Sequence, residues 1–413
     1  MDVSEVNIGG FTLNDFPRSK MKIMVVVGAR PNFMKAAPII DSMKRYDDFF
    51  YPILIHTGQH YDQKLSQLFF DDLELPKPDI YLGVGSGSHA VQTAKIMVEF
   101  EKIVSENRPH MVVVMGDVNS TIACALVAAK CRIPIAHVEA GLRSFDMGMP
   151  EEINRILTDR ISDYLFVTES SGFQNLIKEG VDGNKIFFVG NVMIDSLLAH
   201  SKIAEQRPIL NELGLEMKKY ALLTLHRPDN VDDQKTLARI IEAISEISLK
   251  IPVIFPCHPR TRLNIDKFNL QSYFDDSKFR LVEPAGYLDF LRLQSGAAMV
   301  LTDSGGVQEE TTILNVPCLT LRKNTERPVT LTEGTNTLVG PYREKIVAAA
   351  ENVLNGNVKI GSVPKYWDGK AAGRIVEIFL KIREGLLKSP ADKNGTAKFK
   401  AAAILEASVA REG

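Results

Sequence analysis

The sequence has few cysteines, and none of the four has a partner at a spacing that would bind a metal or form a redox centre. Cys124, Cys131, Cys257 and Cys318 are scattered through 413 residues without a Cys-x-x-Cys motif. We interpret them as reduced packing residues. Long apolar runs are also missing, because stretches such as IMVVVGA and AAMVLT fall well short of the roughly 20 residues that span a bilayer.

The chain also lacks an excess of positive charge and a recognisable secretion signal. Its 49 Lys and Arg residues are balanced by 51 Asp and Glu residues, so no general field attracts nucleic acid or an anionic membrane. The first 20 residues lack the basic flank and apolar core of a signal peptide. We therefore expect a cytoplasmic protein, without nucleic-acid or membrane partners, that binds any anionic ligand through a local cluster of charge.

What the sequence does contain is an alternation of short β-branched runs with segments at helical spacing, which favours a parallel α/β fold. In the first half, strands are expected at residues 22–27, 51–57, 110–115, 133–138, 164–168 and 186–190. In the second half they are expected at residues 220–225, 251–256, 279–283, 297–302 and 317–321. We predict two doubly wound, Rossmann-like domains with a central cleft.

The segment 191–218 contains Pro208 and no strand candidate, so it suits a helical connector between the halves. We place the domain boundary there, with an N-terminal domain at 21–192 and a C-terminal domain at 193–367. The remaining segments are a helix that packs back on the N-terminal domain, an N-terminal extension and a tail, at residues 368–388, 1–20 and 389–413.

The loops after the strands are where an open α/β sheet binds its ligands. The loop GARPNFMK places Arg30 and Lys35 around a helix start, which is compatible with phosphate binding, although an ordinary surface turn explains it equally well. No strand is followed by Gly-x-Gly-x-x-Gly, the dinucleotide fingerprint. A nicotinamide is therefore disfavoured, and we expect no cofactor.

The segment LTDSGGVQEE is a stronger candidate for binding phosphate. Ser304, Gly305 and Gly306 join a strand to a helix, where paired glycines let backbone N–H groups approach an anion. One turn further on, Glu310 is placed to accept both hydroxyls of a ribose, whereas Glu309 can simply complement the helix dipole. The alternative is a glycine turn followed by two helix-start glutamates.

Basic residues also follow other strands of the second half. His226 comes directly after the first of these strands, where it can hydrogen bond a diphosphate or protonate it on departure, or serve the structure alone. Arg322 and Arg327 either face the same crevice or are solvated. His258 has no carboxylates nearby at ligand spacing, so we expect no metal site.

Acids gather in the first half. Asp117 and Glu139 each follow a strand and are expected at one edge of the sheet, within reach of one crevice. Glu151 lies in the first turn of a predicted helix, where an acid is stabilising in any case, and Glu152 is interpreted as an ordinary helix-start acid. Several carboxylates in one cleft raise at least one pKa, so the site can hold both a proton donor and a proton acceptor near neutral pH.

With these residues assembled, the sequence resembles the non-hydrolysing UDP-N-acetylglucosamine 2-epimerases, from about residue 21 to about residue 380. The matching segments are GARPNFMKAAPI, HTGQHYD, GDVNST, HVEAGLRSFDMGMPEEINR, GNVMID, TLHRPDNVDD, TDSGGVQEE and TERP. That family is similar in fold to the two-domain GT-B glycosyltransferases. The resemblance implies a UDP-sugar substrate and a homodimer.

Carried over by position, the resemblance implies that four residues are catalytic: the acid/base carboxylates Asp117, Glu139 and Glu151, with His226 near the diphosphate. It implies that the substrate is bound by Arg30, Lys35, Arg143, Tyr287, Phe290, Ser304, Gly305, Gly306, Glu310 and Arg327. In bacterial relatives a second UDP-N-acetylglucosamine binds beside the active site as an activator. Gln59 and His60 fall in the segment that helps to form that site.

The sequence departs from the family pattern at three positions, which leaves the exact sugar open. Asn32 stands where many members have Glu, Asp229 replaces the usual Glu, and Val329 follows TERP where Glu is frequent. The substrate is then either the simple acetamido sugar or a modified one such as a 2,3-diacetamido uronic acid. A GT-B glycosyltransferase, a hydrolysing epimerase and a UDP-sugar sensor are further alternatives, of which the sensor has no use for three acids.

Inversion at carbon 2 of a UDP-sugar needs special chemistry, because that hydrogen is not adjacent to a carbonyl and is barely acidic. Transient oxidation would require the nicotinamide that the missing fingerprint disfavours. Elimination of UDP to a 2-acetamidoglucal, followed by re-addition with protonation from the opposite face, needs carboxylates and a holder for UDP. We predict reversible epimerisation of UDP-N-acetylglucosamine to UDP-N-acetylmannosamine for a surface polysaccharide or related glycan.

Overall fold

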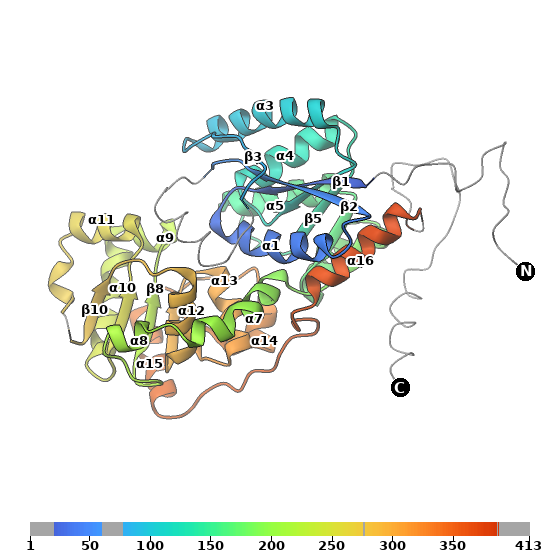
Figure 1. Ribbon diagram of the computed structural model, residues 1–413. Helices are drawn as coiled ribbons and strands as arrows, with labels where there is room; N and C mark the ends of the chain where they lie inside the picture. Colours follow the sequence, from blue (N-terminus) through green and yellow to red (C-terminus); the bar gives the residue numbers. More distant parts are fainter. Residues whose placement is uncertain (1–19, 60–76, 276, 386, 388–413) are drawn as a thin grey trace, which may run out of the picture.

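The computed structural model describes residues 20–59, 77–275, 277–385 and 387. These residues form two parallel sheets, each covered by helices on both faces (Figure 1). The predicted fold class, two Rossmann-like domains of GT-B-like arrangement, is confirmed. The predicted N-terminal extension, apart from Lys20, and the predicted tail lie outside the described residues.

The first sheet has the strand order β3-β2-β1-β4-β5-β6-β7, with parallel pairing throughout. Its strands are β1 (Met21–Val27), β2 (Phe50–His56), β3 (Ile80–Tyr81), β4 (Met111–Met115), β5 (Ile135–Ala140), β6 (Tyr164–Val167) and β7 (Ile186–Phe188). Its helices are α1 (Arg30–Lys44), α3 (His89–Asn107), α4 (Asn119–Lys130), α5 (Pro150–Ile161), α6 (Ser170–Lys178) and a 3₁₀ turn, Gly183–Lys185. The central strands are continuous runs of buried aliphatic residues, as expected when helices cover both faces.

The second sheet has the order β10-β9-β8-β11-β12-β13 and is also parallel. Its strands are β8 (Ala221–Thr224), β9 (Val253–Pro256), β10 (Phe279–Val282), β11 (Met299–Thr302), β12 (Cys318–Thr320) and β13 (Asn336–Leu338). Its helices are α9 (Pro228–Val231), α10 (Gln234–Ser248), α11 (Pro259–Lys267), α12 (Tyr287–Gly296), α13 (Gly305–Leu314), α14 (Pro328–Thr332), α15 (Arg343–Leu354) and a 3₁₀ turn, Gln271–Tyr273.

Every predicted strand is present, with each end within two residues of its predicted position, but two edge strands were not predicted. β3 has two residues and β13 has three, and both lie at a sheet edge. A strand this short carries too little alternation to be recognised from its sequence. Neither of the two changes the position of the site, because the loops that carry the predicted chemistry follow central strands.

The predicted connector forms α7 (Val192–Glu205) and α8 (Ile209–Glu212), and the last described helix, α16 (Ala371–Arg383), returns to the first sheet (Figure 1). The Asp195 carboxylate on α7 accepts hydrogen bonds from the first backbone N–H groups of α16, at 3.2 and 2.8 Å. Phe379 of α16 packs edge-on against Phe50 and Phe166 of the first half. The end of the second half is thereby tied to the core of the first.

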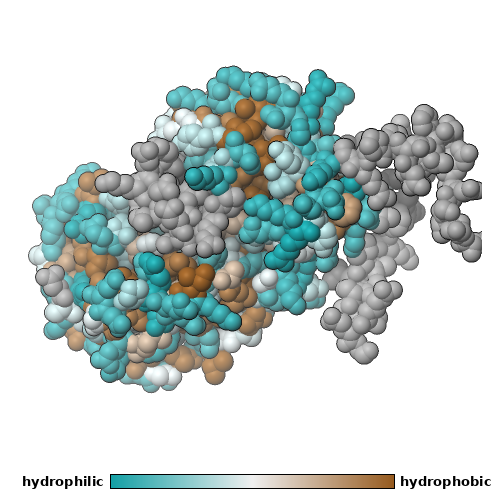
Figure 2. Space-filling view, in the orientation of Figure 1, coloured by the Kyte–Doolittle hydropathy of each residue, from teal (hydrophilic) through white to brown (hydrophobic). Residues whose placement is uncertain are grey.

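The surface and the cysteines agree with most of the sequence interpretation. Figure 2 shows a face that is largely hydrophilic, with hydrophobic residues in separate patches over both halves. Cys124, Cys257 and Cys318 are buried and free, as expected of packing residues, whereas Cys131 is exposed. In the part of the chain that the structure covers, no helix is both long and apolar enough to cross a membrane.

Candidate active site

Asp117 and Glu139 lie at the carboxyl edge of the first sheet, on neighbouring strands. Asp117 follows β4 after a turn at Gly116. The sequence places Glu139 after its strand, but it lies inside β5, at an irregularity between Val138 and Ala140. Its φ of 73° is in the left-handed region, which costs a non-glycine residue about 1–3 kcal/mol and is characteristic of functional sites. The fold thus strains the backbone at a predicted catalytic acid.

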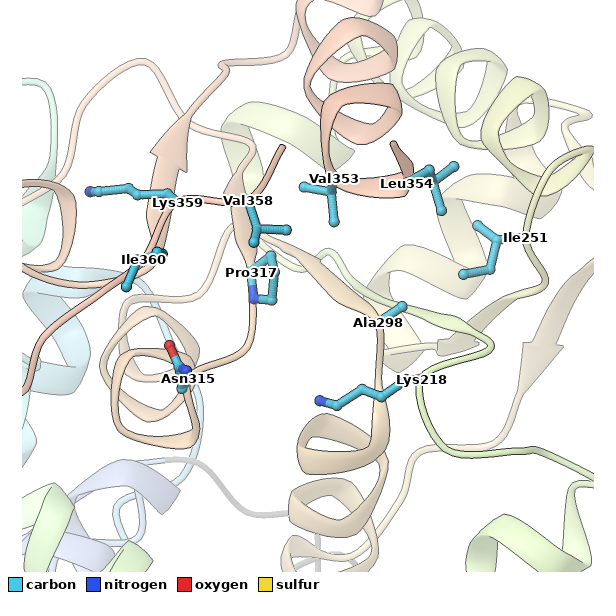
Figure 3. Close-up of a pocket in the computed structure, with 10 residues that line it drawn as sticks. All are labelled: Lys218, Ile251, Ala298, Asn315, Pro317, Val353, Leu354, Val358, Lys359 and Ile360. Atoms are coloured by element: carbon cyan, nitrogen blue, oxygen red, sulfur yellow. The ribbon is translucent and has the colours of Figure 1, made fainter. Parts of the chain in front are cut away.

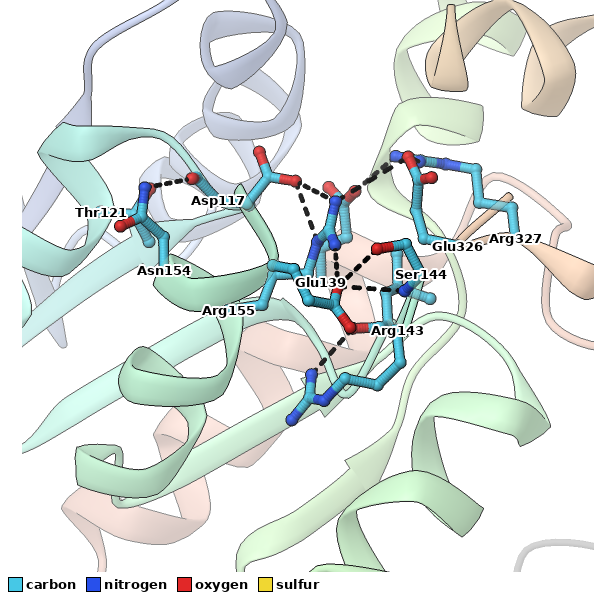
Figure 4. A network of polar contacts seen from close by, with 12 residues as sticks. Asp117, Thr121, Glu139, Arg143, Ser144, Asn154, Arg155, Glu326 and Arg327 are labelled. Atoms are coloured by element: carbon cyan, nitrogen blue, oxygen red, sulfur yellow. Dashed lines mark hydrogen bonds and ion pairs between the residues drawn. The ribbon is translucent and has the colours of Figure 1, made fainter. Parts of the chain in front are cut away.

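The Glu139 carboxylate is buried between two cations that come from different halves. Lys35 of α1 forms an ion pair with it, and Nη2 of Arg327, in the loop before α14, lies 2.7 Å from its Oε1 (Figure 4). Burial lowers the pKa of Lys35 to about 8, so the ammonium releases its proton more readily than an ordinary lysine does. Lys35 and Arg327, both predicted to contact the substrate, thus contact a predicted catalytic acid.

Arg327 is a buried cation surrounded by acids. Besides Glu139, its guanidinium pairs with Glu309 of α13 and with the adjacent Glu326. Burial alone would lower the pKa of Arg327, but the charges of Glu309 and Glu326 raise it, so the guanidinium stays protonated. A Cβ atom on Gly305 would lie 2.4 Å from Arg327 Nη1. Gly305 is therefore required to make room for Arg327, a role that the phosphate-loop interpretation does not include.

Asp117 is held by Arg155 of α5. Nε and Nη2 of Arg155 lie 3.0 and 2.8 Å from Asp117 Oδ2, and Asn154 Nδ2 donates to the Asp117 carbonyl at 2.8 Å (Figure 4). Burial raises the pKa of Asp117, but the charges of Arg155 and Lys35 outweigh burial and hold it below the ordinary value. Because its pKa is lowered, Asp117 is ionised. Its side chain is 25% exposed, so the carboxylate is also accessible.

Glu326, which the sequence interpretation did not single out, is 1% exposed and lies among four arginines. Arg322 Nη2 is 2.8 Å from its Oε2, and Arg227 and Arg155 approach Oε1 to 3.8 and 3.9 Å. Burial raises the pKa of Glu326, but the charges of Arg327, Arg322 and Arg155 hold it well below its usual range. The sequence allowed Arg322 to be either solvated or turned toward the crevice, and the structure shows that it is buried.

These contacts join into one buried cluster, which we call the bridging network because it spans both halves. Its members are Lys35, Asp117, Glu139, Arg155, Glu309, Glu326 and Arg327. Glu309 therefore does more than complement the helix dipole, because it neutralises a buried arginine. The sequence predicts four of the seven members as catalytic or substrate-binding residues.

A second buried cluster, the His137 network, lies within the first half. His137 Nδ1 is 2.7 Å from Asp159 Oδ1, and its Nε2 is 2.9 Å from the Gly116 carbonyl. Arg143 Nη1 is 2.7 Å from the other Asp159 oxygen, and its Nε and Nη2 lie 2.8 and 2.7 Å from the Glu179 carboxylate. Because these acids occupy the Arg143 guanidinium, we propose a structural role for it in place of the predicted substrate contact.

Glu152 is not the ordinary helix-start acid that its position indicates. It is buried and accepts hydrogen bonds from the backbone N–H groups of Ser144 and Phe145 at 3.0 and 2.9 Å, and it pairs with Arg155. Phe145 has a φ of 57°, so the carboxylate braces a turn in the left-handed region. Burial and tertiary partners, which no local pattern reveals, make this acid structural.

The loop after β8 is fixed by Asp303, the residue before the predicted phosphate loop. Its buried carboxylate accepts hydrogen bonds from the backbone N–H groups of His226 and Arg227, and His226 Nδ1 lies 3.1 Å away. Burial raises the pKa of Asp303, but the His226 charge and these hydrogen bonds outweigh burial and lower it. His226 remains 42% exposed. Ser304 is the N-cap residue of α13, where its N–H donates to Thr302 Oγ1 at 2.9 Å.

Glu310 lies on the buried side of α13, beside Tyr287 of α12. The Tyr287 hydroxyl is 3.3 Å from Glu310 Oε1, and burial raises the Glu310 pKa to about 7. Tyr287, a predicted substrate contact, and Glu310, the predicted ribose acceptor, are thus adjacent, although 23 residues separate them. Phe290 is half-buried on the next turn of α12.

The remaining predicted residues are placed as follows. Glu151 is half-buried in the first turn of α5, and Gly306 is half-buried at the start of α13. Gln59 is buried and accepts hydrogen bonds from the Ser120 N–H and hydroxyl at 2.9 and 2.6 Å. Arg30 is the first residue of α1, but its side chain lies outside the described part, as does the whole of His60.

A cavity of about 390 Å³ lies at the opposite, amino edge of the second sheet (Figure 3). It is lined by residues that precede β8, β9, β11 and β12, among them Lys218, Ile251, Ala298 and Pro317, and by the end of α15. None of the predicted site residues lines it. Among the described residues, no group of three or more His, Cys, Asp or Glu side chains is arranged to hold a metal ion.

The fold and the bridging network define a two-domain α/β protein with a buried cluster of acidic and basic side chains where the halves meet. The family model for UDP-N-acetylglucosamine 2-epimerase matches residues 43–380. The chain belongs to this family, and the predicted family and enzyme class are confirmed.

Individual relatives are similar over nearly their whole length. The UDP-N-acetylglucosamine 2-epimerase of Methanocaldococcus jannaschii is 46% identical over 87% of this chain and 98% of its own. A structure of that enzyme in complex with UDP-GlcNAc and UDP matches with a TM-score of 0.82, over 87% of this chain and 99% of that one. The UDP-2,3-diacetamido-2,3-dideoxy-D-glucuronate 2-epimerase of Pseudomonas aeruginosa is 41% identical, over 88% of this chain and 100% of its own.

Proposed function

We propose that the protein reversibly converts UDP-N-acetylglucosamine to UDP-N-acetylmannosamine by inverting carbon 2. The observation that carries this proposal is that Glu139 contacts Arg327 of the second half, while Asp117 pairs with Arg155, which approaches Glu326 of the second half. The relative from Methanocaldococcus jannaschii has this activity in its name, and its structure holds UDP-GlcNAc and UDP. A sensor or a simple binding protein would have no use for strained and buried acids at the ligand.

The chemistry is an elimination followed by an addition. A carboxylate takes the proton from carbon 2 while the anomeric C–O bond breaks, and the electron pair of that bond leaves with UDP. The products of this step are UDP and a 2-acetamidoglucal. UDP then adds back to carbon 1 while a protonated group delivers a proton to the opposite face of carbon 2, which gives the epimer without any net redox change.

The acids suit the two proton transfers in different ways. Asp117 is ionised and partly exposed, which is what a base requires. Glu139 is in contact with Lys35, whose pKa of about 8 lets the pair exchange a proton near neutral pH. Glu151, half-buried on α5, is the third acid of the proposed set. Asp303 fixes the backbone of His226. Together with Ser304 at the start of α13, His226 would hold the departing diphosphate.

The proposal is tested by incubation with UDP-N-acetylglucosamine in deuterated water, followed by NMR of the products. We expect UDP-N-acetylmannosamine to accumulate to an equilibrium and deuterium to enter carbon 2 of both sugars. Epimer without deuterium would exclude the elimination, and free N-acetylmannosamine with UDP would indicate a hydrolysing enzyme.

A second substrate is favoured by the 41% identity to the Pseudomonas aeruginosa enzyme, whose name specifies a 2,3-diacetamido uronic acid. The same elimination applies to that sugar, because carbon 2 carries an acetamido group in both. Parallel measurements of kcat/KM with the two UDP-sugars decide between them, and a preference of more than about 10-fold, equivalent to 1.4 kcal/mol, would assign the substrate.

We also propose a homodimer located in the cytoplasm, and activation by a second UDP-sugar near Gln59 and His60. Light scattering of the purified protein gives the oligomeric state. A sigmoidal dependence of the forward rate on UDP-N-acetylglucosamine concentration would support the activator site, and a hyperbolic dependence would contradict it.

A further inference from the structure

Two adjacent residues of opposite charge reach from the second half to the first. Glu326 and Arg327 lie between β12 and α14. Arg327 Nη2 is 2.7 Å from Glu139 Oε1, and Glu326 Oε1 is 3.9 Å from Arg155 Nη2 (Figure 4). The two contacts have opposite polarity. In one, the acid Glu139 belongs to the first half; in the other, the acid Glu326 belongs to the second half.

Each contact ends at one of the two strand-end acids of the proposed reaction. Arg327 touches Glu139 directly. Glu326 acts through Arg155, whose Nη2 is 2.8 Å from Asp117 Oδ2 and 3.9 Å from Glu326 Oε1. The same nitrogen atom therefore joins a carboxylate of the second half to a predicted catalytic acid of the first.

The burial of these groups makes the contacts sensitive to separation of the halves. Glu326 is 1% exposed, and the Arg155 and Arg327 side chains are also buried. Removing one partner from a buried ion pair leaves an uncompensated charge, which is far more costly than losing a surface pair. When the halves move apart, the ion pair of Arg327 with Glu139 and the contact of Glu326 with Arg155 are lost together. Arg155 is the residue that holds Asp117.

Within the second half, Glu326 is close to Arg227, which belongs to the loop that carries His226. Arg322 holds one carboxylate oxygen at 2.8 Å, and Arg227 approaches the other at 3.8 Å. Arg227 directly follows His226, and both backbone N–H groups are bonded to Asp303. The carboxylate of Glu326 is therefore positioned relative to the proposed diphosphate loop as well as to Asp117.

We propose that Glu326 is a positioning residue: with Arg327 it forms a reciprocal latch that sets Asp117 and Glu139 in their reactive positions only when the two halves are closed. This inference rests on the proposed function for its kinetic consequence. The latch makes proton removal conditional on closure, which keeps the glucal and UDP together until re-addition.

The kinetic test is Glu326→Gln, which keeps the shape and removes the charge. We expect kcat to fall about 10- to 100-fold, because a displacement of about 1 Å at a reacting group has an effect of this size. The Kd for UDP should rise by a smaller factor than kcat falls, because Glu326 does not belong to the proposed UDP contacts and affects UDP only through closure. Glu326→Asp, which keeps the charge, should recover part of the loss. A merely structural residue would change the folded fraction and leave kcat per folded molecule intact.

The matched control is Glu351→Gln, which removes an acid from a surface pair with Lys250, far from the site. It should leave kcat unchanged. A double variant, Glu326→Gln with Arg155→Lys, tests the connection to Asp117. If the two residues act in series, the double variant is no slower than the slower single variant within about threefold; if their losses multiply, the connection through Arg155 is refuted.

A closure measurement separates the latch from the reaction. Dyes on α3 and α10 report the distance between the halves by energy transfer, with UDP at saturation and without turnover. Glu326→Gln should lower the closed fraction relative to the wild type and to Glu351→Gln. An unchanged closed fraction together with kcat within threefold of the wild type would overturn the latch. If the wild type exchanges no deuterium at carbon 2, the proposed function fails, and the energy-transfer result still decides the latch.

If Glu326→Gln does not fold, Glu326→Asp decides the question with the same two measurements. The shorter side chain withdraws its carboxylate from Arg155, so a loss of kcat near 10-fold and a lower closed fraction are expected. Wild-type values for both would overturn the proposal.

Discussion

The bridging network and the His137 network are both buried and charged, yet they have different relations to the fold. The His137 network joins β5, α5 and α6 and lies entirely within the first half. The bridging network joins β5, α1 and α5 to the loop before α14, so it is complete only when both halves are in place. A buried network inside one domain stabilises that domain, whereas one that crosses domains can also control when chemistry occurs.

The largest effect should come from Glu139, the acid at the centre of the bridging network. Glu139→Gln should lower kcat per folded molecule by about 10²- to 10⁴-fold, the usual contribution of a general acid or base. It should also lower the free energy of unfolding, because Lys35 and Arg327 lose a buried partner. Steady-state kinetics together with urea unfolding measures both quantities. A variant that keeps kcat per folded molecule near the wild-type value would show that Glu139, like the His137 network, serves stability alone.

Next comes Asp159, at the centre of the His137 network. Asp159→Asn leaves the Arg143 charge with Glu179 alone and weakens the hold of His137 on the Gly116 carbonyl. We expect a loss of about 3–5 kcal/mol in the free energy of unfolding, the usual result of breaking a buried pair. Denaturant titration measures it. Activity per folded molecule should fall far less than in Glu139→Gln, and an equal fall would contradict the division between the two networks.

Gly305 tests where the bridging network meets the predicted phosphate loop. A Cβ atom there would lie 2.4 Å from Arg327 Nη1, so Gly305→Ala should cost about 1–3 kcal/mol of unfolding free energy through overpacking. Gly306→Ala is the matched control for stability, because its Cβ would meet only Met193 Cε at 3.8 Å. Equal stability of the two variants would show that Arg327 moves aside without cost.

An effect that depends on pH concerns Glu169, the N-cap residue of α6, beside the bridging network. Burial raises the pKa of Glu169 to about 7. Its folded pKa lies above the unfolded value, so its contribution to stability is fully present below about pH 4.5 and is lost as the pH rises through 7. Unfolding free energy measured from pH 5 to 8 should decline less steeply in Glu169→Gln than in the wild type. Parallel profiles would contradict the raised pKa, and Glu351→Gln should leave the slope unchanged.

Most of the fold could be predicted because parallel strands between two helical layers are continuous apolar runs. All predicted strands formed, and β3 and β13 escaped because they are too short for a pattern. The position of Asp117 beyond the end of β4 could be predicted, because it closely follows an apolar run. The interpretation of Glu152 was wrong, because its partners Ser144, Phe145 and Arg155 come together only in the folded loop.

The fold class, the family and the loops that hold the proposed acids and phosphate donors follow from local patterns that occur in a fixed order along the chain. The contacts of those residues depend on the folded structure. It brought Arg327 to Glu139 across 188 positions of the chain, placed Glu326 among four arginines and turned the Glu139 backbone into a left-handed conformation. Pairing between distant residues depends on how two domains meet, and burial then gives each pair its strength.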